Sequence, residues 1–278
     1  MSIFAFIVGA CLGSFANVTM TRLNALSLLS RSKCLSCNVP IRKRDNIPII
    51  SYCIRRGKCF ACQSKYSSQY MWVELAMGLI GLIVYYHVYD EAVPMYLSII
   101  RYSLDMIVFT LLMCISTYDI RHKIVPVQLS LSLIIVGLIL AMTRLWVPGI
   151  ETILHRGIMD NAFIEILGGL LTAMPYALLF FVSRGRWVGF GDVLVFAGVG
   201  WGLGLVSGVS IFLSSIWIGS IFVLLWSIVH RQSAHGMKAV SISKIEIPFA
   251  PFIAIAALLV YTFHLDILGI QSIIMYGL

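Results

Sequence analysis

Two aspartates in apolar surroundings are the residues of this chain best suited to chemistry. Asp119 lies in Ser116-Thr-Tyr-Asp-Ile-Arg-His-Lys-Ile-Val-Pro126 and Asp192 in Gly189-Phe-Gly-Asp192, both where apolar runs meet basic residues. Two carboxylates held close cannot both ionise, so the pair shares a proton. The ionised member can take a proton from an attacking water while the protonated member donates to a peptide carbonyl. If they meet, the two residues predict aspartyl protease chemistry.

Residue types alone leave other roles open for these acids. Either aspartate could cap a helix, or pair with Arg121, Lys123 or Arg186 near lipid headgroups. A transporter or secretion-assembly scaffold that binds a cation through its acids is a further alternative.

Backbone bonded within a helix is closed to proteolytic attack, so a protease in lipid needs a place for an unwound substrate. Gly189 and Gly191 precede the second aspartate, and Pro126 follows the first. We expect these residues to provide irregular backbone beside the acids, where a short extended segment could dock.

Four cysteines have the spacing of a metal site. Cys34 and Cys37 form one C-x2-C pair, and Cys59 and Cys62 form a second after 21 intervening residues. This pattern is typical of a tetrahedral four-thiolate zinc site. Disulfides and iron are the competing interpretations, and a reducing compartment favours the metal.

The other cysteines have different predicted roles. Cys53 lies in the same loop and could substitute for a ligand, whereas we expect Cys11 and Cys114 to pack within helices.

Composition excludes a soluble globular domain. The 278 residues are 60% hydrophobic and only 12% charged, with a net charge of +8. Ten of the twenty Lys and Arg residues fall between positions 22 and 65, beside apolar runs, which indicates a cytoplasmic membrane loop rather than nucleic-acid binding. The first apolar run lacks a basic n-region and a cleavage site, so we expect a retained helix.

Hydropathy predicts an all-α membrane protein of about eight transmembrane helices with a zinc-stabilised cytoplasmic loop. The expected domains are a first helix (1–23), the four-cysteine loop (24–70) and a seven-helix core (71–278). The apolar windows are 2–21, 71–89, 97–117, 127–146, 161–183, 190–206, 208–229 and 249–273.

Basic residues are more numerous in the odd-numbered loops, which predicts an external N-terminus and cytoplasmic odd-numbered loops. Asp105 lies 14 residues before Asp119, about 21 Å along a helix and therefore near the outer face. Glu165 and Asp266 are predicted in the outer halves of their helices.

Asp119 and Asp192 are thus expected at the same cytoplasmic edge of the membrane, on neighbouring loops. Glu74 and Glu246 lie at that level and are reserve candidates for an acidic site.

The first helix carries small and polar residues. Gly9 and Gly13 predict a close helix contact, and Ser14, Asn17 and Thr21 lie nearly on one face. Interhelical hydrogen bonding explains this face most simply, and a polar groove for a substrate or ligand is the alternative.

With these motifs in order, the chain resembles the prepilin peptidases, polytopic intramembrane aspartyl proteases of type IV pilus and type II secretion systems. The resemblance spans nearly the whole chain. It rests on Gly13-Ser-Phe-Ala-Asn-Val18 with Arg22; the double C-x2-C loop with Asn46-Ile-Pro48, Ser51-Tyr52, Gly57-Lys-Cys59 and Glu74-Leu75; Asp119 with Ile124-Val-Pro126; Gly189-Phe-Gly-Asp192; and Ile247-Pro-Phe-Ala-Pro-Phe252.

The resemblance implies a multi-pass inner-membrane enzyme that cleaves type IV prepilins or pseudopilins on the cytoplasmic side, after the glycine that ends a short basic leader. Asp119 and Asp192 would be the catalytic pair. Members with the four-cysteine loop typically also N-methylate the new N-terminus with S-adenosylmethionine. The sequence contains no Gly-rich strand-turn-helix motif for that cofactor, so methylation is expected by analogy alone.

The chain departs from the family pattern at three positions. Leu194 stands where a lysine is common, Val127 where asparagine is frequent, and Tyr118 where isoleucine is frequent. These changes bear on substrate range and methylation rather than on the aspartates. The Tyr-Asp and Gly-x-Gly-Asp pairing also resembles presenilin and signal peptide peptidase, but their Pro-Ala-Leu tripeptide is absent.

Overall fold

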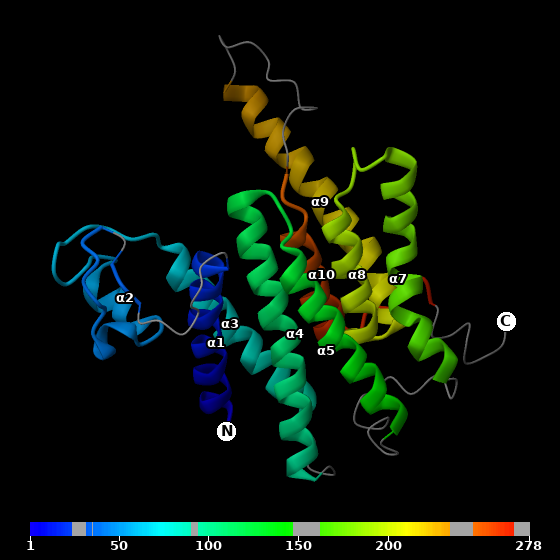
Figure 1. Ribbon diagram of the computed structural model, residues 1–278, viewed down its shortest axis with the longest axis horizontal. Helices are drawn as coiled ribbons and strands as arrows, with labels where there is room; N and C mark the ends of the chain where they lie inside the picture. The colour runs from blue at the N-terminus through cyan, green and yellow to red at the C-terminus, as the bar shows by residue number, and fades with distance from the viewer. Residues whose placement is uncertain (24–31, 35, 90–93, 147–161, 234–246, 270–278) are drawn as a thin grey trace. The chain divides into compact units, whose positions relative to one another are not determined.

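The computed structural model describes residues 1–23, 32–34, 36–89, 94–146, 162–233 and 247–269. Within these ranges the named elements are all helices, and the β structure consists of two isolated bridges (Figure 1). The helices are α1 (Ser2–Arg22), η1 (Lys43–Asn46), α2 (Ile50–Arg55), α3 (Gln69–Val88), α4 (Met95–His122), α5 (Val127–Trp146), α7 (Ala162–Ser183), α8 (Phe190–Leu203), α9 (Leu205–Ser233) and α10 (Ala250–Phe263).

The all-α prediction is confirmed, because each predicted apolar window contains a helix. Among the described residues, five helices are long and apolar enough to cross a membrane: α1, α3, α4, α7 and α9. Three further helices, α5, α8 and α10, have shorter apolar stretches. The chain is therefore a multi-pass membrane protein, and the count of eight spans stays a prediction.

The last predicted window was wrong at its C-terminal end. We expected a helix over 249–273, but α10 ends at Phe263, and His264 adopts a left-handed conformation with φ 50°. The Ile267 N–H then donates to the Ser210 hydroxyl on α9. Asp266 consequently lies beyond the helix rather than in its outer half.

The chain divides into two compact units, residues 1–117 and 118–278, and the division falls within α4. In the first unit, α1 and α3 run in opposite directions and pack closely. A Cβ on Gly9 would overlap the Met77 carbonyl, and one on Gly13 would lie 2.8 Å from Glu74 Cα. The close contact predicted for these glycines is confirmed.

The polar face of α1 also contacts α3. Asn17 Nδ2 donates to the Tyr70 carbonyl at 3.1 Å, and the Ser14 hydroxyl hydrogen-bonds the Glu74 side chain. Interhelical hydrogen bonding therefore accounts for Ser14 and Asn17. Thr21 instead bonds backbone carbonyls of its own helix.

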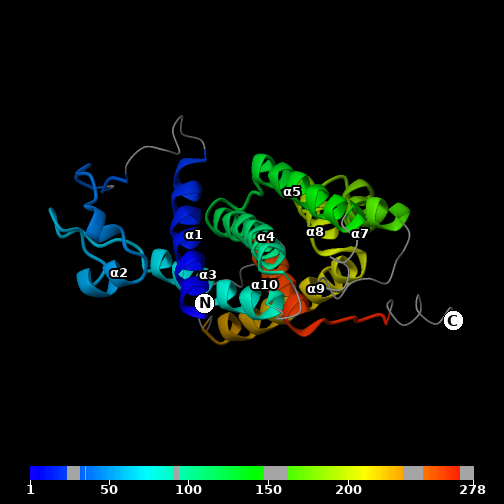
Figure 2. The same cartoon turned by 90° about the horizontal axis from the view of Figure 1, so that it is seen from below.

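In the second unit, α8 is the central helix. It packs against α5, α7, α9 and α10, and Figure 2 shows it between α5, α7 and α9. Its residues are buried almost all round, as expected for a helix that is apolar on every face. Two of its glycines face these neighbours closely: a Cβ on Gly198 would lie 2.7 Å from the Leu133 side chain, and one on Gly200 would lie 2.6 Å from the Thr172 hydroxyl.

Helices α8 and α9 are separated by a single residue. Gly204 has φ 87° and ψ 161°, a backbone conformation that side chains exclude. The predicted windows 190–206 and 208–229 place this boundary at residue 207, three residues later than the break at Gly204.

Candidate active site and metal centre

Asp119 lies in the last turn of α4 and is buried, with 4% of its surface exposed. Its Oδ2 accepts a hydrogen bond of 3.0 Å from the N–H of Ala250, the first residue of α10. The Asp119 carboxylate is thus held at the N-terminus of another helix, where the N–H groups are free to donate and the helix dipole favours a negative charge.

Asp192 lies in the first turn of α8 and is 8% exposed. Gly189 is the N-cap of this helix, with extended backbone at φ −76°, and its carbonyl accepts from the Asp192 N–H at 3.2 Å. Asp192 Oδ1 is buried and has no hydrogen-bond partner among the described residues. This oxygen is therefore available to a bound group.

The structure brings these two aspartates to one place in the second unit, since their carboxyl groups interact electrostatically. The contact that joins their elements is between Gly191 on α8 and Val125 on the α4–α5 connection: a Cβ on Gly191 would lie 2.5 Å from Val125 Cβ. Gly191 is helical, so the irregular backbone beside the acids consists of Gly189 and the residues before it, together with residues 123–126.

An aromatic cluster that sequence reasoning missed lies beside Asp192. The Tyr176 ring stacks on Phe196 with centroids 4.3 Å apart and also contacts Phe212 and Phe249. Tyr176 interacts electrostatically with Asp192, and its hydroxyl bonds Ser215. The sequence signal that could have indicated this cluster was a tyrosine directly after Pro175 in a largely apolar helix.

The two reserve acids have different outcomes. Glu74 belongs to the first unit, where it is buried and its Oε2 accepts from the Ile49 N–H at 2.8 Å. Glu246 lies outside the described residues. Glu74 therefore accepts a hydrogen bond from the backbone of the four-cysteine loop.

Cys34, Cys37, Cys59 and Cys62 come together as predicted. Their sulfur atoms all lie within 4.8 Å of one another. The Cys34 and Cys62 sulfurs are 3.8 Å apart, and those of Cys37 and Cys59 are 4.0 Å apart. A tetrahedral ion with Zn–S bonds of about 2.3 Å requires sulfurs about 3.8 Å apart. The four thiols therefore fit a single zinc ion.

The two cysteine pairs adopt the same local fold. In each, the N–H of the first cysteine donates at 3.0 Å to the carbonyl five residues later, Val39 or Ser64. The residue after the second cysteine is left-handed in each: φ is 56° at Asn38 and 58° at Gln63. The bridges Lys33–Pro40 and Lys58–Lys65 close the two knuckles at the same positions.

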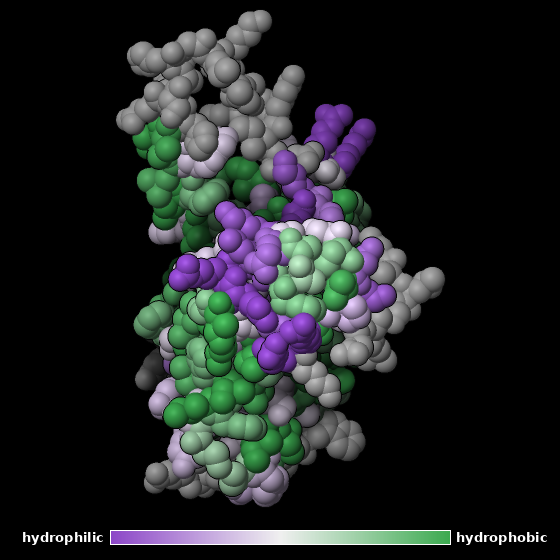
Figure 3. Space-filling view, turned by 90° about the vertical axis from the view of Figure 1, so that its left-hand side faces the viewer, coloured by the Kyte–Doolittle hydropathy of each residue, from purple (hydrophilic) through white to green (hydrophobic). Residues whose placement is uncertain are grey.

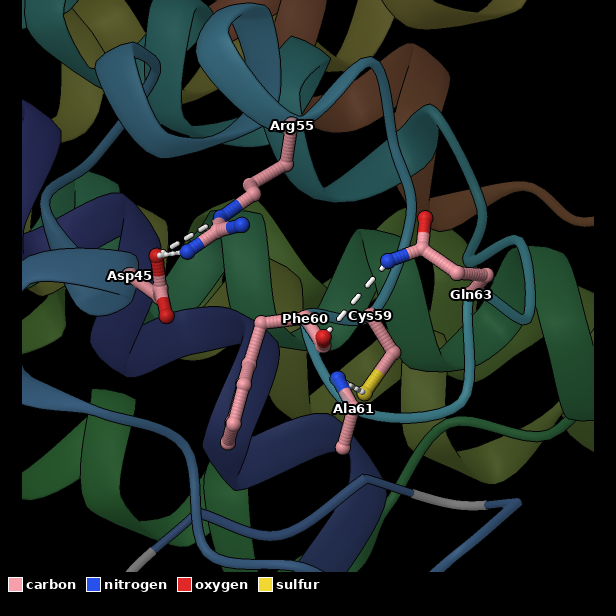
Figure 4. Close-up of polar contacts among 6 residues, drawn as sticks. All are labelled: Asp45, Arg55, Cys59, Phe60, Ala61 and Gln63. Atoms are coloured by element: carbon pink, nitrogen blue, oxygen red, sulfur yellow. Dashed lines mark hydrogen bonds and ion pairs between the residues drawn. The ribbon is translucent and has the colours of Figure 1, made fainter.

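Backbone N–H groups are directed at the ligand sulfurs. Ala61 donates to Cys59 Sγ at 3.5 Å (Figure 4). Hydrogen bonds from the backbone of Cys37 and Ser36 lower the pKa of the Cys34 thiol to about 6. Such donors stabilise thiolates, the form that binds metal.

The remaining cysteines lie apart from this cluster. Cys114 is buried, as expected of a packing residue, but Cys11 is exposed on α1, so its predicted packing role was wrong for the described part of the chain. Cys53 is exposed on α2.

Comparison with known proteins agrees with this arrangement of sites. Residues 7–88 match the bacterial peptidase A24 N-terminal domain, and residues 106–224 match the type IV leader peptidase family. The chain belongs to the type IV leader peptidase family. The first match contains all four cysteines of the cluster, and the second contains both aspartates.

Curated relatives of this leader peptidase are similar over most of their length. A prepilin leader peptidase/N-methyltransferase of Stutzerimonas stutzeri is 28% identical over 91% of this chain and 87% of the relative. Proteins of the same name from Pseudomonas putida and Dichelobacter nodosus are 25% and 27% identical, covering 94% and 73% of the relatives. No solved structure matches the chain.

Proposed function

We propose that this protein is an intramembrane aspartyl endopeptidase that removes the basic leader from type IV prepilins or pseudopilins. The name that its relatives share, prepilin leader peptidase/N-methyltransferase, supports the substrate class. The observation that carries the proposal is that Asp119 and Asp192, 73 residues apart in sequence, are both buried and interact electrostatically. Asp119 and Asp192 are the proposed catalytic residues, supported by the backbone at Gly189 and Gly191.

Hydrogen bonding supports different roles for the two carboxyl groups. Asp119 accepts from the Ala250 N–H, which favours its ionised form, so it is the proposed base that takes a proton from water. Asp192 has an unpartnered buried oxygen and is the proposed acid, which protonates the carbonyl oxygen of the scissile peptide. Water adds to the carbonyl carbon and leaves a proton on Asp119. As the intermediate collapses, Asp119 gives this proton to the leaving nitrogen and Asp192 takes one back from a hydroxyl of the intermediate, so the C–N bond breaks and the new amino terminus is released.

The proposed metal is zinc, held by the thiolates of Cys34, Cys37, Cys59 and Cys62. When bound it would cross-link two knuckles of a loop that is too small and polar to fold around a core of its own. Its proposed role is structural. The sulfur separations support zinc rather than two disulfides.

The proposed location is the bacterial inner membrane, with the N-terminus periplasmic and both the active site and the zinc loop cytoplasmic. Ten basic residues between positions 22 and 65 support this orientation. The proposed domains remain 1–23, 24–70 and 71–278, with eight spans.

Methylation of the new N-terminus is proposed from the names of the relatives, with S-adenosylmethionine as the methyl donor. Nothing among the described residues identifies a pocket for this cofactor. Transfer of a labelled methyl group to a cleaved prepilin tests this activity separately, and an unlabelled product would leave a peptidase only.

The proposed peptidase activity is tested with purified protein and a co-reconstituted prepilin. Asp119→Asn and Asp192→Asn preserve size, but the first removes the proposed base and the second removes the proposed acid. Each should abolish leader removal while the protein retains its melting temperature and metal content. Undiminished cleavage in either variant would remove that residue from the catalytic pair. Asp266→Asn, a matched change outside the helices, is the control and should retain both folding and leader removal.

A further inference from the structure

The four-cysteine loop exposes large apolar side chains to its surroundings. Ile47, Ile50 and Ile54 are 44%, 54% and 74% exposed. Ile50 and Ile54 are four residues apart and therefore lie on one face of α2. Figure 3 looks onto the side of the molecule that carries this loop and shows an apolar patch bordered by hydrophilic residues. Exposed isoleucines in a polar loop indicate a site of contact with a membrane or with another protein.

The depth of α2 is fixed by its hydrogen bonds to the α1–α3 hairpin. The N–H of Ile49, the N-cap of α2, donates to Glu74 Oε2 at 2.8 Å. Glu74 is bonded in turn by Ser14 on α1. Ser14 lies eight residues before the end of α1 at Arg22, which is about 12 Å along the helix. Helix α2 therefore begins beside the hairpin well inside its end, at a level where both α1 and α3 have the composition of membrane spans.

The backbone of α2 is suited to an environment without water. Glu74 satisfies the N–H at the N-cap, and the N–H groups of Arg56 and Gly57 bond the carbonyls of Cys53 and Tyr52. In lipid no water can bond an unsatisfied backbone group, so irregular backbone at membrane depth must be bonded within the protein. A buried carboxylate that accepts the Ile49 N–H meets this requirement.

The charges around the isoleucines favour a lipid surface over a basic peptide. Arg44 and Arg56 flank the apolar stretch and are exposed. Of the two nearby acids, Asp45 is paired with Arg55 at 2.8 Å (Figure 4), and Glu74 is buried and bonded to the Ile49 N–H. Exposed basic residues close to an anionic membrane are attracted to its surface. A basic prepilin leader would instead be repelled.

We propose that residues 47–56 form an interfacial segment that inserts into the cytoplasmic leaflet. Ile47, Ile50 and Ile54 contact acyl chains, and Arg44 and Arg56 contact the phosphates of anionic phospholipids. Trp72, 59% exposed in the first turn of α3, lies at the same end of the hairpin and is the type of residue found at membrane interfaces. The zinc-binding loop is consequently anchored to the bilayer at a second point beside its two flanking helices.

The test uses the full-length protein in nanodiscs of phosphatidylethanolamine and phosphatidylglycerol that contain a trace of phosphatidylcholine with a diazirine on its acyl chain. After photolysis, trypsin releases residues 45–55, which contain all three isoleucines, separately from the second knuckle (59–65) and from the α3 segment (66–101). The expected result is label on 45–55 at a yield similar to that of 66–101, with knuckle peptide 59–65 at least tenfold lower.

Two variants separate insertion from general folding. Ile50→Ser with Ile54→Ser should reduce the label on 45–55 several-fold while label on 66–101 and bound zinc are unchanged. Glu74→Ala, which removes the acceptor for Ile49, should also reduce it, and Glu74→Gln, which retains an acceptor oxygen, should not.

An unlabelled 45–55 peptide beside a labelled 66–101 peptide would overturn the proposal. So would covalent linkage of 45–55 to a second copy of the chain or to an added prepilin in place of lipid, because the isoleucines would then form a protein-docking surface.

Discussion

Gly191 and Val125 are in contact so close that a Cβ on the glycine would lie 2.5 Å from Val125 Cβ. This contact holds the first turn of α8, which carries Asp192, against the connection that follows Asp119. Nothing larger than hydrogen fits at position 191 without separating the two segments. The proposed catalytic geometry therefore depends on this glycine.

Gly191→Ala should reduce prepilin cleavage about 100-fold, because a displacement of about 1 Å at reacting groups has effects of this size. Val125→Ala should restore part of the lost rate by making room for the new methyl group. Gly168→Ala on α7 is the matched control, since a Cβ there would make only ordinary contacts, the nearest at 3.6 Å to Leu205. Equal losses in both glycine variants would contradict this role of Gly191.

Zinc binding should weaken as pH falls from 8 to 5, and most steeply below about 6. Hydrogen bonds from Cys37 and Ser36 hold the pKa of Cys34 at about 6, so its thiolate is present above that pH and protonated below it. Protons then compete with the metal at every ligand. Chelator competition between pH 5 and 8 measures the effect, and a pH-independent affinity would contradict a four-thiolate site.

Cys34→Ser and Cys59→Ser should each lose the metal, as measured by elemental analysis of the purified protein. Each removes one ligand from a different knuckle, so the loss should be equal in the two. Cys53→Ser is the control within the same loop and should retain the metal, because Cys53 lies outside the sulfur cluster. Retention of zinc in either ligand variant would exclude that cysteine.

The left-handed residue of the second knuckle offers a test of its geometry. Gln63 is exposed and has φ 58°, where a β-branched side chain is strongly disfavoured. Gln63→Val should weaken zinc binding about tenfold, corresponding to roughly 1–2 kcal/mol of strain. Gln63→Gly adopts this conformation freely and should bind at least as tightly. Equal affinities of the valine and glycine variants would show that the knuckle does not require the left-handed turn.

Much of this architecture was predictable from local patterns. Apolar windows located the helices because each span must be continuous and apolar, and the spacing of Cys34, Cys37, Cys59 and Cys62 was sufficient to predict one metal site. The end of α10 was not predictable in this way. Residues 264–269 include Leu265, Ile267 and Leu268, so the apolar window continues past the end of the helix. The Ile267 N–H instead bonds Ser210, a tertiary contact that hydropathy cannot predict.

The candidate site shows the same limit. Residue type identified Asp119 and Asp192, yet sequence gave no indication that Ala250 would bond Asp119 from 131 residues away. Tyr176 was missed because its proximity to Asp192 depends on how α7 packs against α8. The role of Glu74 was also different from the one considered, since its partner is the backbone of Ile49 in the loop.

The most direct test of the account compares initial rates of prepilin cleavage for four proteins: wild type, Asp119→Asn, Asp192→Asn and the double variant. If the two carboxyl groups act as one catalytic unit, each single change should cost about 10⁴-fold or more, and the double variant should be no slower than the slower single variant. A single variant that cleaves at the wild-type rate, or a double variant whose loss is the product of two modest losses, would contradict a shared catalytic pair.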